Sequence, residues 1–199
     1  MIKLIIFDFD GVIENNYEAH YQLSKKKIIN ITREEHRKMF EGNIHLAREK
    51  LKHRDTGFDF MTHFSNTKKD AIIKDDIKKV LLQLSEEYTF GIITSAHEYG
   101  VEDYFAKNKI SNLFSFIYGF ETDKIKVHKF KKVLDTYDIK KEECIFVTDT
   151  LGDILEANNI GIKTIALDFG YHERERLQKG NPAKIISDFD ELIPAIKSL

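Results

Sequence analysis

The chain opens on a short apolar run that ends at two aspartates separated by one residue. Residues 2–7 are apolar except for Lys3, which is typical of a strand buried on both faces of a parallel sheet. Asp8 and Asp10 should then emerge together at the carboxyl end of that strand, where open α/β sheets bind ligands. Two carboxylates this close repel each other unless a cation or a difference in protonation relieves them. The pattern predicts a metal site or acid–base chemistry, although a strand that ends in a polar turn would look the same.

Two later strand-like runs end in polar residues as well. Residues 90–93 lead into Thr94, Ser95 and Ala96, and hydroxyl groups and free backbone N–H groups at such a turn suit phosphate oxygens. Residues 144–148 lead into Asp149, and Asp153 follows four residues later in the first turn of a predicted helix. Carboxylates with this spacing can share one cation, directly or through water, although Asp153 could instead cap its helix.

Composition indicates a globular protein and excludes several classes of function. With 199 residues, 42% of them hydrophobic, and a net charge of −2, the chain can bury a core and fits one domain or a core with a small subdomain. Neither a nucleic-acid nor a membrane partner is implied. The first apolar run is too short for a signal peptide, so a cytoplasmic location is expected. The only cysteine, Cys144, lies inside an apolar run and is predicted to be a buried thiol.

The chain divides into a helical insert and a core of alternating strands and helices. Residues 15–74 show helical spacing, with a capping box from Thr32 to Glu35 that predicts a helix starting at residue 33. From residue 75 onward, helices are predicted near 76–87, from 101, at 128–137 and 151–158, and strands near 116–118, 163–167 and 184–186, before a last helix capped by Ser187. We therefore expect an α/β fold, a doubly wound parallel sheet with right-handed crossovers formed by residues 1–14 and 75–199, and a small helical cap formed by residues 15–74.

The order of these motifs resembles the haloacid dehalogenase superfamily, within it the phosphoglycolate phosphatase and β-phosphoglucomutase-like branch with a helical cap after the first motif. On the pattern of that family, Lys124 stands at the family lysine, Phe130 at a helix aromatic and Asp149 at the metal aspartate. Two positions depart from the pattern. Ile125 replaces the usual proline after the lysine, and Thr148 replaces the usual glycine before the aspartate. A β-branched residue at 148 is expected to crowd the backbone and to lower activity.

The resemblance implies a magnesium-dependent phosphatase that acts on a small phosphorylated metabolite. Asp8 would be the nucleophile that forms an aspartyl-phosphate, and Asp10 the general acid and then the general base. Mg²⁺ would be held by the Asp8 carboxylate, the Asp10 carbonyl and Asp149, with Asp153 a ligand directly or through water. The phosphoryl oxygens would be bound by Thr94, Ser95, Ala96 and Lys124.

Several alternatives stay open from the sequence. Lys126 or Lys129 could replace Lys124 as the phosphate-binding lysine. His20 and His97 could contact a substrate, although a solvated position is the better expectation for both. The family often has Asp-Ser or Asp-Thr where this chain has Asn15 and Asn16.

Two other functions would use the same motifs. A phosphomutase would yield an isomer of its substrate instead of free phosphate. A catalytically silent phosphate- or metal-binding module would have no need of both Asp8 and Asp10. A dehalogenase is disfavoured because it would require neither Asp10 nor Asp149.

Overall fold

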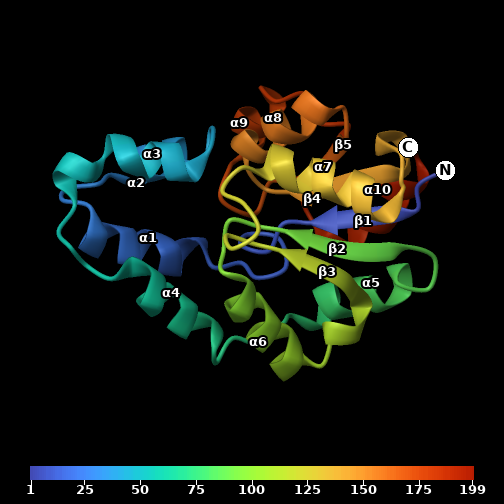
Figure 1. Cartoon of the computed structure of the whole chain (residues 1–199), viewed down its shortest axis with the longest axis horizontal. Coiled ribbons are helices and arrows are strands. Elements are labelled where there is room, and N and C mark those ends of the chain that lie inside the picture. The colour runs from blue at the N-terminus through green and yellow to red at the C-terminus, as the bar shows by residue number, and fades with distance from the viewer.

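Six parallel strands form one sheet at the centre of the computed structural model, which describes residues 1–199 (Figure 1). Their order across the sheet is β3-β2-β1-β4-β5-β6, so β1 is a central strand, as predicted. The strands are β1 (Leu4–Phe7), β2 (Thr89–Ile93), β3 (Phe114–Tyr118), β4 (Cys144–Thr148), β5 (Lys163–Leu167) and β6 (Lys184–Ile186). The predicted doubly wound α/β fold is confirmed, because helices connect the parallel strands and cover both faces of the sheet.

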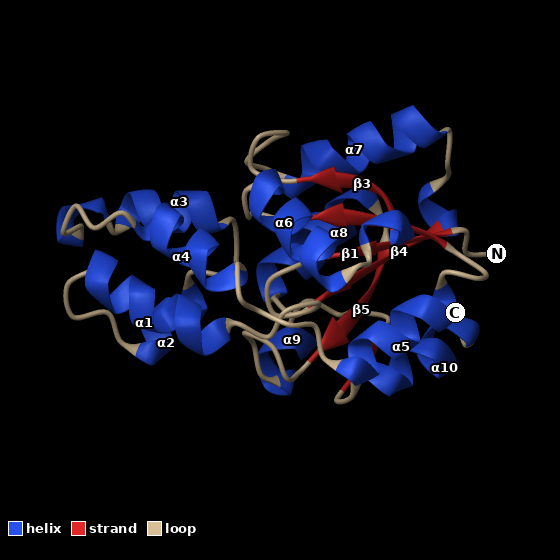
Figure 2. Ribbon diagram, turned by 90° about the horizontal axis from the view of Figure 1, so that it is seen from below, coloured by secondary structure: helices blue, strands red, loops and turns tan.

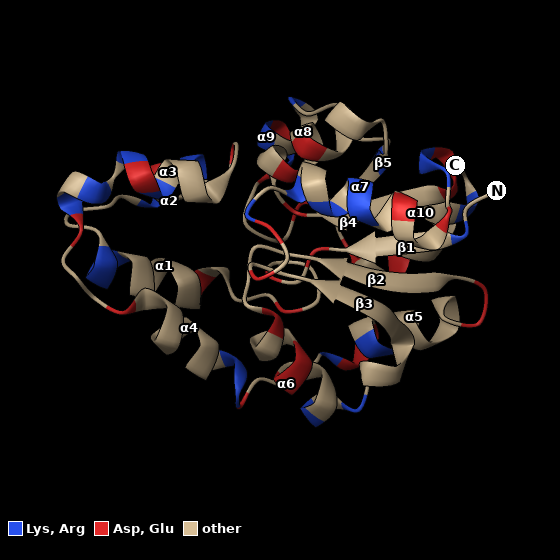
Figure 3. Ribbon diagram, viewed as in Figure 1, with Lys and Arg blue, Asp and Glu red and all other residues tan.

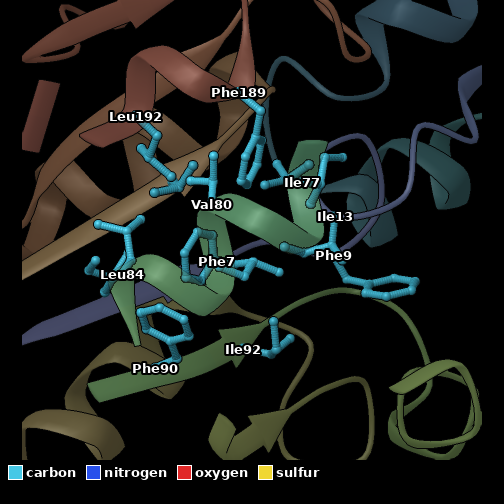
Figure 4. Close-up of a cluster of buried hydrophobic side chains, with 14 of the residues drawn as sticks. Phe7, Phe9, Ile13, Ile77, Val80, Leu84, Phe90, Ile92, Phe189 and Leu192 are labelled. Atoms are coloured by element: carbon cyan, nitrogen blue, oxygen red, sulfur yellow. The ribbon is translucent and has the colours of Figure 1, made fainter. Parts of the chain in front are cut away.

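One face of the sheet carries the larger apolar core. Ile5 and Phe7 of β1 point to this face, as alternate residues of a strand must, and pack with the helices α5, α6 and α10 (Figure 4). Helix α5 presents Ile77, Val80 and Leu84 on one stripe, the spacing of an amphipathic helix. These helices are α5 (Asp75–Leu84), α6 (Glu98–Asn108) and α10 (Leu192–Lys197).

The opposite face is covered by helices that follow β3, β4 and β5. Leu4 and Ile6 of β1 point this way and join a cluster with Phe130 of α7 and Ala157 of α8. Cys144 lies in the same cluster with 1% of its surface exposed, which confirms the prediction of a buried thiol. The helices on this face are α7 (Lys126–Tyr137), α8 (Leu151–Ile160) and α9 (Arg174–Gln178).

Four further helices lie together beyond the carboxyl ends of the strands (Figures 1 and 2). We call residues 15–74, which contain them, the helical insert. Helix α2 begins at Arg33 behind the predicted capping box, in which Thr32 and Glu35 bond to each other's backbone N–H groups. The four are α1 (Tyr17–Lys27), α2 (Arg33–Lys38), α3 (Ile44–Lys50) and α4 (Phe60–Lys68). None of the helices has the length and apolar character needed to span a membrane.

Some element boundaries differ from the expectations. Helix α6 begins at Glu98 and helix α7 at Lys126, each two or three residues earlier than predicted. Ser187 does not cap the last helix, because its hydroxyl donates to Asp168 Oδ2 at 3.0 Å, and a 3₁₀ turn at Phe189–Glu191 precedes α10. Three more 3₁₀ turns lie at Lys52–Arg54, Ser111–Leu113 and Lys141–Glu143.

Candidate active site

Three neighbouring strands bring the predicted polar residues to one edge of the sheet. Asp8 follows β1, Thr94 follows β2 and Asp149 follows β4, and β2 and β4 are the two partners of β1. Phe7 pairs in register with Ile92 and with Val147, so the three strands end at nearly the same level. Figure 3 shows acidic segments in the loops at this edge, which faces the helical insert.

Asp8 is buried, and both of its carboxylate oxygens are engaged. Oδ1 accepts the N–H of Phe9 at 2.7 Å, and Oδ2 lies 3.0 Å from Lys126 Nζ. The same ammonium group lies 2.7 Å from Asp153 Oδ2. Lys126 is the first residue of α7, and its side chain therefore reaches back to the strand ends and joins two carboxylates.

The structure places Lys126, and not Lys124, beside the carboxylates at the strand ends. Lys124 is exposed, and its Nζ lies 5.5 Å from the centre of the Phe120 ring instead of at the strand ends. Lys126 takes that place because α7 begins two residues after Lys124, at Lys126 itself. The other alternative, Lys129, is buried beneath the turn and donates to the carbonyl of Thr94 at 2.6 Å.

Asp149 is fully buried, and two glycines lie against its carboxylate. Its Oδ2 accepts the N–H of Tyr171 at 2.7 Å, whereas its Oδ1 has no hydrogen-bond partner. Gly11 has φ +86°, and a Cβ there would lie 1.8 Å from Oδ2; a Cβ on Gly170 would lie 2.3 Å from the same atom. Both positions therefore require glycine. The sequence singled out neither Gly170 nor Tyr171.

Asp153 does not cap its helix. Thr150 is the N-cap residue of α8, and its hydroxyl oxygen accepts the N–H of Asp153. The carboxylate of Asp153 instead accepts from Lys126 and from the hydroxyl of Thr148, at 2.7 Å each. The threonine at position 148 thus contributes a hydrogen bond to the site, a role that the expectation of crowding did not include.

The carboxylates of this edge carry more negative charge than one lysine can neutralise. Burial raises the pKa of Asp8 to about 7, although Lys126 opposes the shift. Burial and the neighbouring charge of Asp8 raise the pKa of Asp149 well above its usual range. Burial acts in the same direction on Asp153, but Lys126 and the hydrogen bonds outweigh it and lower its pKa. A cation at this edge would favour the ionised forms.

The oxygen atoms at the edge fit a hard divalent cation. Asp149 Oδ1 is a buried acceptor without a partner, and the Asp10 carbonyl accepts no backbone hydrogen bond. No three Asp, Glu, His or Cys side chains converge as a complete ligand set, and Lys126 contacts both Asp8 and Asp153. A cation here would draw on the Asp10 carbonyl, on Asp8 and Asp149, and on water, which suits Mg²⁺, an ion that keeps several of its waters.

Asp10 is bound by the helical insert. Lys68 Nζ, at the end of α4, lies 2.8 Å from Asp10 Oδ1, and Asn16 Nδ2 donates to the same oxygen at 2.6 Å. The Lys68 ammonium is buried between the rings of Phe9 and Phe64, 4.5 and 4.7 Å from their centres. Sequence reasoning missed Lys68, because nothing in its local pattern distinguishes it from the other lysines of the insert.

The turn after β2 lies at the cavity, and one of its backbone donors is already engaged. Thr94, Ser95 and Ala96 line the same cavity as Asp8 and Asp10. The N–H of Ala96 donates to Thr94 Oγ1 at 3.1 Å, so this group is already engaged within the turn. Within this turn, the hydroxyl of Thr94 and the donors of Ser95 are left for an anion in the cavity.

A cavity of about 60 Å³ lies between the strand ends and the helical insert. This volume holds only a few waters. The insert contributes two basic side chains, His20 and Arg48, to its lining. The full lining set is Asp8, Asp10, His20, Phe40, Gly42, Asn43, Ile44, Arg48, Phe60, Met61, Phe64, Thr94, Ser95, Ala96, Lys126, Thr150, Asp153, Glu156 and Tyr171.

His20 is buried, which corrects the expectation of a solvated side chain. Its Nδ1 lies 2.8 Å from Nε2 of His36, and burial together with the neighbouring His36 lowers its pKa well below the usual value. Arg48 bonds to His20 Nε2 at 3.4 Å and to Met61 Sδ at 3.9 Å, so neither of its partners is a carboxylate. His97 lies outside the cavity and pairs with Glu121.

Besides the contacts of Lys68 and Asn16 with Asp10, the insert is hydrogen-bonded to the core near the start of α8. The N–H of Gly152 donates to the carbonyl of Phe40 at 2.9 Å. His172 Nδ1 accepts the N–H of Leu151, and its Nε2 donates to the carbonyl of Arg37, both at 2.9 Å. Because one ring nitrogen accepts and the other donates, His172 is neutral in this arrangement.

Comparisons with known proteins found matches over most of the chain. The family model described as haloacid dehalogenase-like hydrolase matches residues 5–167. A phosphoglycolate phosphatase of Photorhabdus laumondii is 30% identical over 127 residues, and the match covers 61% of this chain and 53% of that protein. The chain therefore spans about half the length of that relative.

Two full-length matches are more distant. A pyrophosphatase named PpaX from Bacillus mycoides is 22% identical over 219 residues, which covers 100% of this chain and 98% of that one. A haloacid dehalogenase-like hydrolase of Streptococcus pneumoniae superposes with a TM-score of 0.79 at 19% identity over 98% of both chains. At this identity the second match shows a common fold.

Proposed function

We propose that this chain, which belongs to the haloacid dehalogenase-like hydrolase family, is a magnesium-dependent phosphatase of small phosphomonoester metabolites. The observation that carries the proposal is the arrangement at the end of β1. The carboxylate of Asp8 faces the cavity beside one buried ammonium group, 3.0 Å away, and the neighbouring Asp149 has a buried oxygen without a partner. This arrangement combines a nucleophile, a positive charge and a free metal ligand.

In the proposed reaction, an Asp8 carboxylate oxygen attacks phosphorus, and the bond between phosphorus and the leaving oxygen breaks. Asp10 gives a proton to the leaving alkoxide. Water then attacks the aspartyl-phosphate and loses a proton to Asp10, which releases inorganic phosphate and restores Asp8. Lys126, Thr94 and Ser95 stabilise the charge that builds on the phosphoryl oxygens.

The metal ion would be held by Asp8, the Asp10 carbonyl and Asp149, with Asp153 bound directly or through water. When bound, it would supply positive charge that lowers the pKa of Asp8 and neutralises the phosphoryl group. The residues fit this role because every donor is an oxygen.

The helical insert, residues 15–74, would serve as a cap that closes the cavity and selects the substrate. Arg48 projects a positive charge that no carboxylate of the chain offsets at hydrogen-bond distance. A leaving group with its own negative charge would offset it, and phosphoglycolate, after which the Photorhabdus laumondii relative is named, has a leaving group of that charge.

A phosphate-release assay over a panel of small phosphomonoesters, with and without Mg²⁺, tests the proposal. We expect release that depends on Mg²⁺ and that vanishes in Asp8→Asn, which keeps the shape of the side chain but not the nucleophile. Asp10→Asn should slow the release from an alkyl phosphate by roughly a hundredfold or more, the usual contribution of a placed general acid. An aryl phosphate should suffer less, because its leaving group needs little protonation.

Two results would contradict the proposal. Wild-type turnover in both variants on every accepted substrate would show that another residue carries the reaction. Accumulation of a phosphorylated isomer without free phosphate would identify a mutase. The metal site is tested separately by thermal unfolding, because Mg²⁺ should raise the Tm of the wild-type protein more than that of Asp149→Ala.

A further inference from the structure

Asn16, at the junction between core and insert, does not make the hydrogen bond that is usual for an N-cap residue. It is the N-cap residue of α1, a position where asparagine normally accepts a backbone N–H of the first helical turn, yet its side chain makes no such bond. Its Nδ2 instead donates to Asp10 Oδ1 at 2.6 Å and to Glu14 Oε2 at 3.2 Å. A local rule broken in favour of a distant contact is expected at functional positions.

The orientation of the Asn16 amide is fixed by Tyr171. The hydroxyl of Tyr171, which is 155 residues away in the chain, donates to Asn16 Oδ1 at 2.9 Å. A flipped amide would place its oxygen against the carboxylates of Asp10 and Glu14 and would lose both hydrogen bonds to them. The Tyr171 ring is 2% exposed and packs edge-to-face on Tyr17 and Phe40, so its hydroxyl has little freedom to move.

The same tyrosine also contacts the aspartate on the neighbouring strand. Its backbone N–H donates to Asp149 Oδ2 at 2.7 Å. One residue thus links Asp149, through its main chain, to Asp10, through its hydroxyl and Asn16. Asn16 and Lys68 both contact the same carboxylate oxygen of Asp10, Oδ1. The other oxygen, Oδ2, is left for proton transfer.

We propose that Tyr171 and Asn16 are positioning residues for the acid–base step: the Tyr171 hydroxyl orients the Asn16 amide, which holds Asp10 with one oxygen engaged and the other directed at the leaving group. This inference rests on the proposed function and assigns Asp10 a supporting pair that the sequence motifs do not contain. Neither residue touches the phosphoryl group, so their effect should follow the demand of the leaving group for a proton.

The test compares two substrates in four variants. Tyr171→Phe keeps the ring and the N–H bond to Asp149 and removes only the hydroxyl. Turnover (kcat) of an alkyl phosphate such as glycerol 2-phosphate should fall about tenfold, the effect of one lost hydrogen bond, with KM little changed. The first step with 4-nitrophenyl phosphate, measured as release of 4-nitrophenol in a single turnover, should hold within about twofold, because a good leaving group hardly needs the acid. This second rate also shows that the variant is folded and that Asp8 works.

Tyr17→Phe is the matched control. Tyr17 lies in the same aromatic cluster, and its hydroxyl is buried without a partner, so its removal should leave both rates unchanged. Asn16→Ala should slow the alkyl phosphate at least as much as Tyr171→Phe. The double variant should be no slower than Asn16→Ala alone, because the tyrosine acts through the amide.

Three results would overturn the inference and leave the proposed function intact: equal losses on both substrates in Tyr171→Phe, no loss on the alkyl phosphate, or fully additive losses in the double variant. A wild-type protein that hydrolyses neither phosphate, with Mg²⁺ present, would overturn the proposed function and this inference with it.

Discussion

The core and the helical insert contribute to the site by different physical means. The largest apolar cluster, of 26 buried residues, lies on one face of the sheet, whereas the clusters within and beside the insert contain four and three. The core can therefore fix Asp8, Thr94 and Asp149 through strand pairing alone. The insert has too small a core to fix its residues in that way. Its position depends on polar contacts with the core, among them Lys68 with Asp10 and Arg176 with Glu34.

The two regions also handle charge in opposite ways. At the strand ends, burial raises the pKa values of Asp8 and Asp149, so the folded core holds protons more tightly than the unfolded chain. In the insert, burial lowers the pKa values of His20 and His36, so the folded insert resists protons. The strand ends favour a cation, whereas the side of the cavity that the insert lines is mostly apolar and aromatic and includes one arginine, Arg48. Each prediction below tests one side of this contrast.

The largest effect is expected at the lysine of the core. Lys126→Met removes the positive charge between Asp8 and Asp153 and the donor nearest to the phosphoryl oxygens. Turnover should fall roughly 10²- to 10³-fold, the usual cost of removing one such donor. Lys124→Met is the matched control, since Lys124 is exposed and stacks on Phe120. The measurement is the turnover of one phosphomonoester in steady-state kinetics. A larger loss of turnover in Lys124→Met than in Lys126→Met would identify Lys124 as the phosphate-binding lysine.

A smaller loss is expected when the contact between the two regions is disturbed. A Cβ on Gly152 would lie 2.5 Å from the carbonyl oxygen of Gly42 and 2.8 Å from that of Phe40. Gly152→Ala must therefore push the insert away from α8. Misplacement of this order can cost up to about a hundredfold in turnover even though no group at the reaction centre is changed. Gly42→Ala is the control, because a Cβ there would meet nothing within 4 Å. Equal kinetics in the two variants would mean that closure of the insert does not matter.

The core part of the site could be predicted from the sequence, because chemistry and topology coincide there. An apolar run that ends in a carboxylate or hydroxyl marks a strand end, and parallel strands place such ends on one edge. The bounds of β5 and β6 follow from the same pattern. Lys124 and Lys126 lie only two residues apart, and local pattern could not decide where α7 begins. The structure places Lys126 at that start.

The insert part of the site could not be predicted, since it depends on tertiary contacts. Lys68, Arg48 and Tyr171 meet Asp10 or the cavity from distant points of the chain, and each has an unremarkable local pattern. Asn16 gave a partial signal: it departs from the residues usual in the resembling family. The sequence showed the departure but not the tyrosine that makes use of it.

The charge contrast predicts how stability responds to acid. Burial lowers the pKa of His36 to about 3, whereas the unfolded value is near 6.5. Between these values the unfolded chain binds a proton that the folded chain does not, so the free energy of unfolding falls as pH falls. The contribution of one histidine is about 1.4 kcal/mol per pH unit. Asp8 and Asp149 act in the opposite direction, but they are common to wild type and variant.

Removal of His36 tests this contribution, together with the part that acts through its neighbour His20. In His36→Gln, the free energy of unfolding should fall less steeply with falling pH, and the difference in slope should correspond to about one bound proton. The measurement is urea denaturation between pH 4.5 and 6, a range of about 1.5 pH units. His53→Gln replaces an exposed ring of the same region and should keep the wild-type slope. An unchanged slope in His36→Gln would show that His36 is not held neutral in the folded insert.

The smallest effect is expected at Arg48, and it tests whether the insert selects charge. Arg48→Met keeps an apolar side chain against Phe60 but removes the guanidinium, whose partners in the structure are His20 and Met61. For a substrate with an anionic leaving group, KM should rise about tenfold, in line with the loss of one charge-assisted hydrogen bond. For a substrate of similar size with a neutral leaving group, KM should hardly change, and kcat should be kept for both because Arg48 does not contact Asp8. Arg54→Met is the matched control, since Arg54 pairs with Glu35 away from the cavity. An equal rise in KM for both substrates would mean that Arg48 supports the structure of the insert and does not bind the charge of the leaving group.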